Sequence, residues 1–183
     1  MPLYITSATN SVITLEQLIA SRDARQERQL AWLEHHSTTL ISYTVVAPGP
    51  MKDSELTRRI FNHGIRALRQ LAETNVWEIK KQTCLALATG PEGLLAIDAL
   101  PAKVKLAVIE LEQSHPLGRL WDIDILSQHG QILSRRDFDL PPRSCLVCQH
   151  AASICAREKT HALPELIAHM EALLNTAENA SHF

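Results

Sequence analysis

The sequence has little net charge. Its 18 lysines and arginines stand against 20 aspartates and glutamates, a formal charge of -2. A domain that attracts nucleic acid or an anionic membrane through its overall field is strongly basic, so neither is an expected partner. Any phosphate-binding surface must therefore be local.

Long apolar runs are also missing. None approaches the ~20 residues needed to cross a bilayer. Residues 1–10 lack the positive region followed by an apolar stretch that marks an export signal. The sequence therefore predicts a cytoplasmic protein with no membrane partner.

Cysteine is scarce, with four residues in 183. Without an export signal, these favour free thiols or metal ligands over structural disulfides. The length and the 45% apolar content suit one domain with a core, and no repeat, low-complexity tract or linker divides the chain. We predict a single domain, 1–183, with poorly ordered tails over about 1–13 and 176–183.

Helix signals come from caps, proline positions and apolar spacing. Thr14 and Gln17 form a capping box, Asp53 or Ser54 caps a second helix, and Pro101 suits a first helical position. The predicted helices cover about 15–34, 54–73, 101–114 and 164–174.

Strand signals are β-branched runs and alternation between turn residues. They predict strands over 39–47, 76–81 with 83–89, 94–98 and 119–126, and a hairpin return over 132–138. Gly90-Pro91-Glu92-Gly93 reads as a turn.

The sharpest chemical feature is an acidic pair on a predicted strand. Side chains two apart share a face, so Asp122 and Asp124 point the same way, roughly 6–7 Å apart along the strand. A cation between them relieves their repulsion, and Mg²⁺ with substrate phosphates is the natural candidate. The alternative is an edge strand whose aspartates face water.

Basic residues cluster at two places that suit phosphate. Arg22, Arg25 and Arg28 step by three along the first predicted helix. Lys52, Arg58 and Arg59 flank the Pro-Gly-Pro loop and the next helix start, where free N–H groups favour anions. The alternative for each cluster is a solvated face with local ion pairs.

The C-terminal cysteines offer possible zinc ligands. Two residues separate Cys145 from Cys148, and Cys155 follows with His161 or His150. The alternatives are reduced cysteines buried as small apolar residues or a redox-sensitive pair.

Four motifs, in order, resemble those of the transferases that attach the phosphoribosyl-dephospho-coenzyme-A prosthetic group to the acyl carrier subunit of citrate lyase. The resemblance covers about Leu15 to Leu174. The motifs are residues 21–29, residues 48–52 with Thr57-Arg58-Arg59, residues 110–124, and residues 143–148 with 155–157 and His161.

This resemblance implies a reaction. The donor is 2′-(5″-triphosphoribosyl)-3′-dephospho-coenzyme A. The acceptor is a serine of the apo acyl carrier (gamma) subunit, and the products are the holo carrier and pyrophosphate. The predicted strands and helices indicate an α/β (α+β) fold, a mixed, largely antiparallel sheet with flanking helices. The acidic strand makes this fold similar to the nucleotidyltransferase fold. Common nucleotidyltransferases carry Gly-Ser where this chain has Gly118-Arg119, so their phosphate-loop geometry is not carried over.

The expected catalytic residues are Asp122, Asp124 and Arg119, with the two aspartates holding Mg²⁺. A third carboxylate stays open among Glu110, Glu112, Asp137 and Asp139. The expected substrate-binding residues are Arg22, Arg25, Lys52, Arg58, Arg59, His115, Gly118, Arg143 and Arg157. The expected zinc ligands are Cys145, Cys148, Cys155 and His161.

Two other functions fit parts of the pattern. One is a non-catalytic zinc-containing adaptor that binds an acyl carrier or lyase subunit, in which the cysteines matter and the aspartates do not. The other is a general nucleotidyltransferase that uses ordinary nucleotides.

Overall fold

The computed structural model describes residues 8–180, which divide between two compact units with a boundary after Leu133. Parts of the two predicted tails, residues 1–7 and 181–183, lie outside the described residues. That the whole chain behaves as one domain stays a prediction. Among the described residues, no helix combines the length and apolar composition that crossing a bilayer requires.

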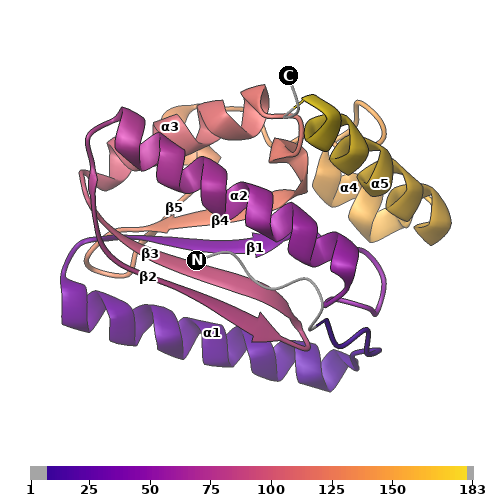
Figure 1. The fold of residues 1–183 in the computed structure, drawn as a ribbon, viewed down its shortest axis with the longest axis horizontal. Coiled ribbons are helices and arrows are strands. Elements are labelled where there is room, and N and C mark those ends of the chain that lie inside the picture. The colour runs from indigo at the N-terminus through magenta and orange to yellow at the C-terminus, as the bar shows by residue number, and fades with distance from the viewer. Residues whose placement is uncertain (1–7, 181–183) are drawn as a thin grey trace. The chain divides into compact units, whose positions relative to one another are not determined.

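The first unit is an antiparallel sheet with helices on both faces (Figure 1). The strand order is β2-β3-β1-β4-β5, and every neighbouring pair is antiparallel. The elements are α1 (Leu15–His36), β1 (Thr39–Val45), α2 (Glu55–Thr74), β2 (Glu78–Leu87), β3 (Gly90–Asp98), α3 (Pro101–Ser114), the 3-10 turn η2 (Gly118–Leu120), β4 (Trp121–Leu126) and β5 (Ile132–Leu133). The predicted α/β class with a largely antiparallel sheet is confirmed.

The second unit is mainly helical. It contains the 3-10 turn η3 (Arg135–Phe138), α4 (Ala152–Glu158) and α5 (Leu163–Ala180). Between η3 and α4 the chain forms a tight loop that is closed by a β-bridge between Ser144 and Ala151. The last helix begins one residue before the predicted start and continues through residues expected to belong to the tail.

The predicted helix starts are confirmed in detail. The Thr14 hydroxyl accepts from the Gln17 backbone while the Gln17 side chain accepts from the Thr14 backbone. Ser54, one of two candidate caps, forms the same reciprocal arrangement with Thr57. These local contacts satisfy N–H groups that a helix start leaves open.

Three predicted boundaries are wrong. The hairpin between β2 and β3 turns at Ala88-Thr89, so residues 90–93 belong to β3 and not to a turn. Strand β4 begins at Trp121, because Arg119 lies in the 3-10 turn before it. The hairpin partner of β4 is only Ile132–Leu133, since residues 135–138 form a 3-10 turn capped by Asp137.

The two faces of the sheet differ in chemistry. Helices α2 and α3 cover a face packed with large apolar side chains, where Tyr43 stacks on Phe61 with 4.8 Å between ring centroids. Helix α1 covers the other face (Figure 1), which has a small apolar cluster of Leu33, Leu40, Leu94 and Leu126. Beyond that cluster the α1 face becomes polar.

A buried ion pair holds the loop between β1 and α2. Arg58 is 1% exposed and Asp53 0% exposed, and they form two hydrogen bonds of 2.6 and 2.9 Å. Asp53 also accepts from the Thr9 backbone at 2.8 Å. Burial alone would raise the pKa of Asp53, but the hydrogen bonds from Arg58 and Thr9 lower it below its usual value.

We predict that Asp53→Ala lowers the free energy of unfolding by about 3–5 kcal/mol, because it leaves the Arg58 guanidinium buried without its counter-charge. Urea unfolding followed by circular dichroism measures this change. The control is Glu78→Ala, which removes an exposed pair with Lys80 at 2.6 Å and should change stability by no more than about 0.5 kcal/mol. Equal effects of the two variants would contradict the assigned role of the buried pair.

The same pair predicts a pH dependence. The folded-state pKa of Asp53 lies below its ordinary value of 3.8, so its contribution is complete above that value and is lost as the pH falls through the lower folded-state pKa. Unfolding curves of wild type and Asp53→Asn between neutral and acidic pH measure the effect. The difference in stability between the two proteins should shrink as the pH falls below 3.8. A difference independent of pH would rule out this contribution.

Candidate functional site

Strand pairing places Asp122 and Asp124 beside polar residues of β1 and β3. On β1, Thr44 is the register partner of Asp122 on β4 and of Glu92 on β3, and Ser42 is the partner of Asp124. Directly opposed residues in antiparallel strands point to the same side of a sheet. All five side chains therefore share one face.

That face is the one covered by α1. The Gln29 side chain, on α1, donates to the Ser42 hydroxyl at 2.8 Å. The intervening residues of β4, Trp121 and Ile123, are buried on the opposite face. Asp122 is exposed and Asp124 is half-buried, so the predicted alternation of this strand is confirmed.

Glu92 is the most deeply buried carboxylate on the α1 face. Only 3% of its side chain is exposed, and each oxygen accepts from a different arginine of α1. Arg25 Nε lies 2.9 Å from one oxygen and Arg28 lies 2.5 Å from the other. Two guanidinium groups thus face one carboxylate, which leaves an excess of positive charge on this part of the sheet face.

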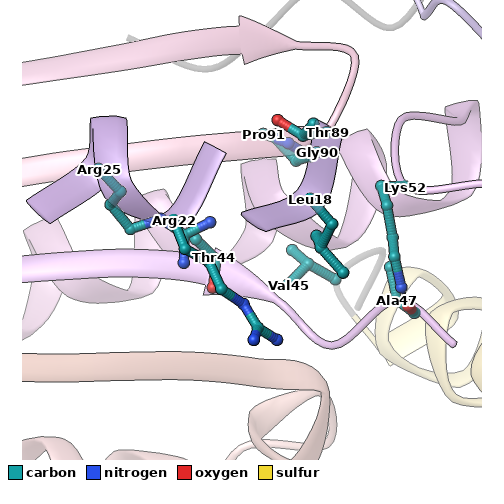
Figure 2. A pocket seen from close by; sticks show the side chains of 10 residues that line it. All are labelled: Leu18, Arg22, Arg25, Thr44, Val45, Ala47, Lys52, Thr89, Gly90 and Pro91. Atoms are coloured by element: carbon teal, nitrogen blue, oxygen red, sulfur yellow. Dashed lines mark hydrogen bonds between the residues drawn. The ribbon is translucent and has the colours of Figure 1, made fainter. Parts of the chain in front are cut away.

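A cavity of about 140 Å³ opens beside these residues (Figure 2). In Figure 2, Arg22 and Arg25 extend from α1 across β1 near Thr44. The lining residues are Leu18, Arg22, Arg25, Thr44, Val45, Ala47, Lys52, Thr89, Gly90 and Pro91. We call this cavity, together with Glu92, Asp122 and Asp124, the α1 groove.

The cavity lining is cationic. Its ten residues include two arginines and one lysine and no carboxylate. Lys52 donates to the Ala47 carbonyl at 2.5 Å, and its pKa is lowered by burial and by the charge of Arg22. An anion in the cavity would relieve this repulsion, so the lining fits phosphate.

Three other predicted residues lie at the entrance to β4. A side chain on Gly118 would place its Cβ 2.2 Å from the Glu112 carbonyl oxygen, so the backbone contact requires glycine. His115 ends α3, accepts from the Leu117 backbone at 3.0 Å and lies against Trp121. Burial and the nearby His63 lower the pKa of His115. These contacts are structural, and the substrate roles expected for Arg119, His115 and Gly118 stay predictions.

The two arginines of α2 that were predicted to bind substrate have intramolecular partners. Arg58 is held by Asp53 in the buried pair, and half-exposed Arg59 faces Glu55 one helical turn away. Neither is among the residues that line the cavity. Their predicted contacts with substrate stay predictions.

Two of the four candidates for a third carboxylate lie away from the acidic pair. Glu110 and Glu112 belong to α3, on the face of the sheet opposite the acidic pair. Asp137 accepts from the Ser134 backbone at 2.6 Å and caps η3, and Asp139 follows it in the second unit. A role for either as the third carboxylate stays a prediction. Glu92, which sequence reasoning assigned to a turn, is the carboxylate that shares the α1 face. Recognition of the two-residue turn at Ala88-Thr89 would have placed it on a strand.

The second unit contains a separate cluster. The ligand atoms of Cys145, Cys148, Cys155 and His161 all lie within 4.8 Å of one another, so this Cys₃His set could bind a metal ion. Arg143 precedes the cluster and Arg157 lies on α4. Their predicted contacts with phosphate stay predictions.

The cluster perturbs the thiols in opposite directions. Burial would raise the pKa of Cys145. The backbone N–H groups of Val147 and Cys148 donate to its sulfur, however, and lower its pKa to about 6. Burial and the neighbouring thiols raise the pKa of Cys155 to about 11. The thiols of this cluster therefore do not behave as independent surface cysteines.

Comparison with known proteins identifies the family. Residues 13–177 match the model for apo-citrate lyase phosphoribosyl-dephospho-CoA transferase. Relatives described by that same name in Escherichia coli O139:H28 and Shigella flexneri serotype 5b are each 58% identical over 178 residues, covering 97% of this chain and 97% of theirs. The match spans both the α1 groove and the Cys₃His cluster, and the resemblance noted in the sequence is confirmed. The chain belongs to the apo-citrate lyase phosphoribosyl-dephospho-CoA transferase family.

Proposed function

We propose that this chain transfers the phosphoribosyl-dephospho-coenzyme-A group from its 5″-triphosphoribosyl donor to a serine of the apo acyl carrier subunit of citrate lyase, and that the α1 groove is the site of transfer. The observation that supports this site is the cationic cavity beside two carboxylates on one sheet face. A polyphosphate substrate needs cationic side chains to bind its phosphate oxygens and carboxylates to hold the metal ion that accompanies it.

The proposed reaction is a displacement at the α-phosphorus of the donor. The serine oxygen forms a new bond to that phosphorus while the bond to the bridging oxygen of the leaving pyrophosphate breaks. The hydroxyl proton passes to a base or to water, and pyrophosphate leaves with the electron pair. The products are a phosphodiester-linked carrier and pyrophosphate, so atoms and charge balance.

The acidic pair fits a magnesium ion. Mg²⁺ prefers carboxylate oxygens together with substrate phosphates and water, and Asp122 and Asp124 supply carboxylates from one strand face. When bound, such an ion neutralises phosphate charge and stabilises the leaving group. The two aspartates would hold it at the edge of the groove, next to Thr44, which lines the cavity.

The cations of the cavity would receive the rest of the polyphosphate. Arg22 and Lys52 approach from α1 and from the loop before α2, so an anion between them would contact two separate elements. Arg25 is shared between the cavity and Glu92, which accepts from its Nε and fixes its orientation. Fixed guanidinium groups bind phosphate with little loss of side-chain entropy.

The adaptor alternative draws on the Cys₃His cluster. A zinc ion there does not separate the two functions, because an enzyme also uses structural zinc. Transfer activity separates them, since an adaptor would leave the carrier mass unchanged. A general nucleotidyltransferase would instead release pyrophosphate from ATP or CTP without any carrier.

We predict that Asp122→Asn and Asp124→Asn each reduce transfer by about a hundredfold or more, because each variant removes a charge that would hold the metal. Purified protein, donor, Mg²⁺ and apo carrier are incubated, and intact mass spectrometry follows the gain of the prosthetic group. The control is Asp98→Asn at the far end of β3, whose carboxylate is 62% exposed and pairs with Lys80. This control should retain wild-type transfer. Full activity in both acidic-pair variants would refute the proposed site.

We predict that Arg22→Met and Lys52→Met weaken donor binding by about tenfold or more, because each removes one charged contact with phosphate. Steady-state kinetics at varied donor concentration should show this mainly as a raised KM. Arg69→Met, a charge-matched change on the exposed surface of α2, is the control and should leave KM unaltered. An unchanged KM in both groove variants would place the donor elsewhere.

A further inference from the structure

The second unit carries a convergent set of ligands that the transfer chemistry does not use. We infer that Cys145, Cys148, Cys155 and His161 bind one zinc ion, and that this ion stabilises the fold of the second unit. None of these four residues lines the cavity proposed to bind the donor.

The spacing of the cluster fits a tetrahedral ion better than a disulfide. Three sulfurs and one imidazole nitrogen lie within 4.8 Å of one another, and Cys148 Sγ is 3.5 Å from Cys155 Sγ. Zinc–sulfur bonds of ~2.3 Å in a tetrahedron place sulfurs roughly 3.8 Å apart. A disulfide bond of about 2.05 Å would use only two of the four groups.

The first two ligands lie on a tight loop closed by backbone hydrogen bonds. The Cys145 N–H donates to the His150 carbonyl at 2.6 Å, and Ser144 bridges to Ala151. Inside the loop, the Val147 N–H points to the Cys145 sulfur at 3.5 Å. Backbone donors directed at sulfur stabilise a thiolate, the form that binds metal.

The other two ligands come from α4 and the turn after it. Cys155 is buried on α4, and Lys159, directly after the end of the helix, turns the chain with a φ of 51°. The Thr160 N–H then returns to the Cys155 carbonyl at 3.1 Å. This reversal directs the chain so that His161 joins the three sulfurs.

His161 has the environment of a metal ligand. Its Nε2 is buried and has no hydrogen-bond partner, a costly state for a ring nitrogen that no ligand contacts. Its Nδ1 faces the Glu165 carboxylate at 3.6 Å. A histidine that binds zinc through one nitrogen commonly directs the other to a carboxylate, which fixes the ring and raises its basicity.

The ligand types select the metal and its role. Three thiolates and one imidazole favour zinc, and hard cations such as Mg²⁺ prefer oxygen. Four protein ligands leave no open position for substrate, which is typical of a structural site.

The small size of the second unit explains the need for such an ion. Among residues 134–180, the buried apolar side chains are Cys155, Met170, Leu174 and Ala177. A unit of this size with so small a core commonly relies on a metal or disulfide for stability. Zinc bound across residues 145–161 would tie the loop, α4 and the following turn together.

Metal analysis of the full-length protein tests the inference. Protein purified without chelator should contain one zinc per chain by inductively coupled plasma mass spectrometry. Cys148→Ser and His161→Gln should each lose most of the zinc. The matched controls are Cys84→Ser on β2 and His150→Gln, a histidine 3.4 Å from Cys148 but outside the ligand set, and both should retain it. Zinc lost from His150→Gln and retained by His161→Gln would overturn the assigned ligands.

Cobalt substitution avoids dependence on variants that fail to fold. Apo wild type titrated with Co²⁺ should develop thiolate charge-transfer and tetrahedral d–d absorption that saturates at one ion per chain and is abolished by Zn²⁺. Removal of zinc should also speed proteolysis within residues 134–183. Wild type that contains neither zinc nor the cobalt spectrum, or that shows a Cys148–Cys155 disulfide by alkylation and mass spectrometry, would refute the site.

Discussion

The position of α1 depends on one buried carboxylate. The buried residues of this helix are only Gln29 and Leu33, so apolar packing alone holds it weakly. Glu92 is almost fully desolvated and needs both Arg25 and Arg28 to offset the loss of water. The two contacts set the rotation and register of α1, and that register places Arg22, nearly one turn earlier, at the cavity.

Much of the fold follows from local sequence. The caps at Thr14 and Ser54 are satisfied within one helical turn, and residues 39–45 form a strand because their β-branched side chains suit a buried, pleated position. Glu92 is different. Residues 90–93, Gly-Pro-Glu-Gly, have the composition of a turn. They belong to a strand because the chain turns at the two residues before them and because Glu92 pairs with Thr44. Its role depends on contacts with residues more than sixty positions away.

The site residues show the same limit. Asp122 and Asp124 could be assigned to one face because alternation is a local property of a strand. Lys52 and Arg58 look equivalent in sequence. In the structure, Arg58 forms a buried ion pair with Asp53, whereas Lys52 lines the cavity. The cysteine spacing indicated three of the ligands but left the fourth open between His150 and His161. The chain reversal at Lys159, which the spacing does not reveal, brings His161 to the three cysteines.

The buried pair in the first unit has a consequence for molecular recognition. Lys52 is the chain neighbour of Asp53, whose backbone and side chain also receive hydrogen bonds from Asn10 and Thr9. The loop that carries Lys52 is therefore ordered during folding and has little freedom left to lose when an anion arrives. The conformational entropy of this loop is lost when the protein folds, not when the anion binds. The loop is therefore preorganised for binding and does not have to close over the anion.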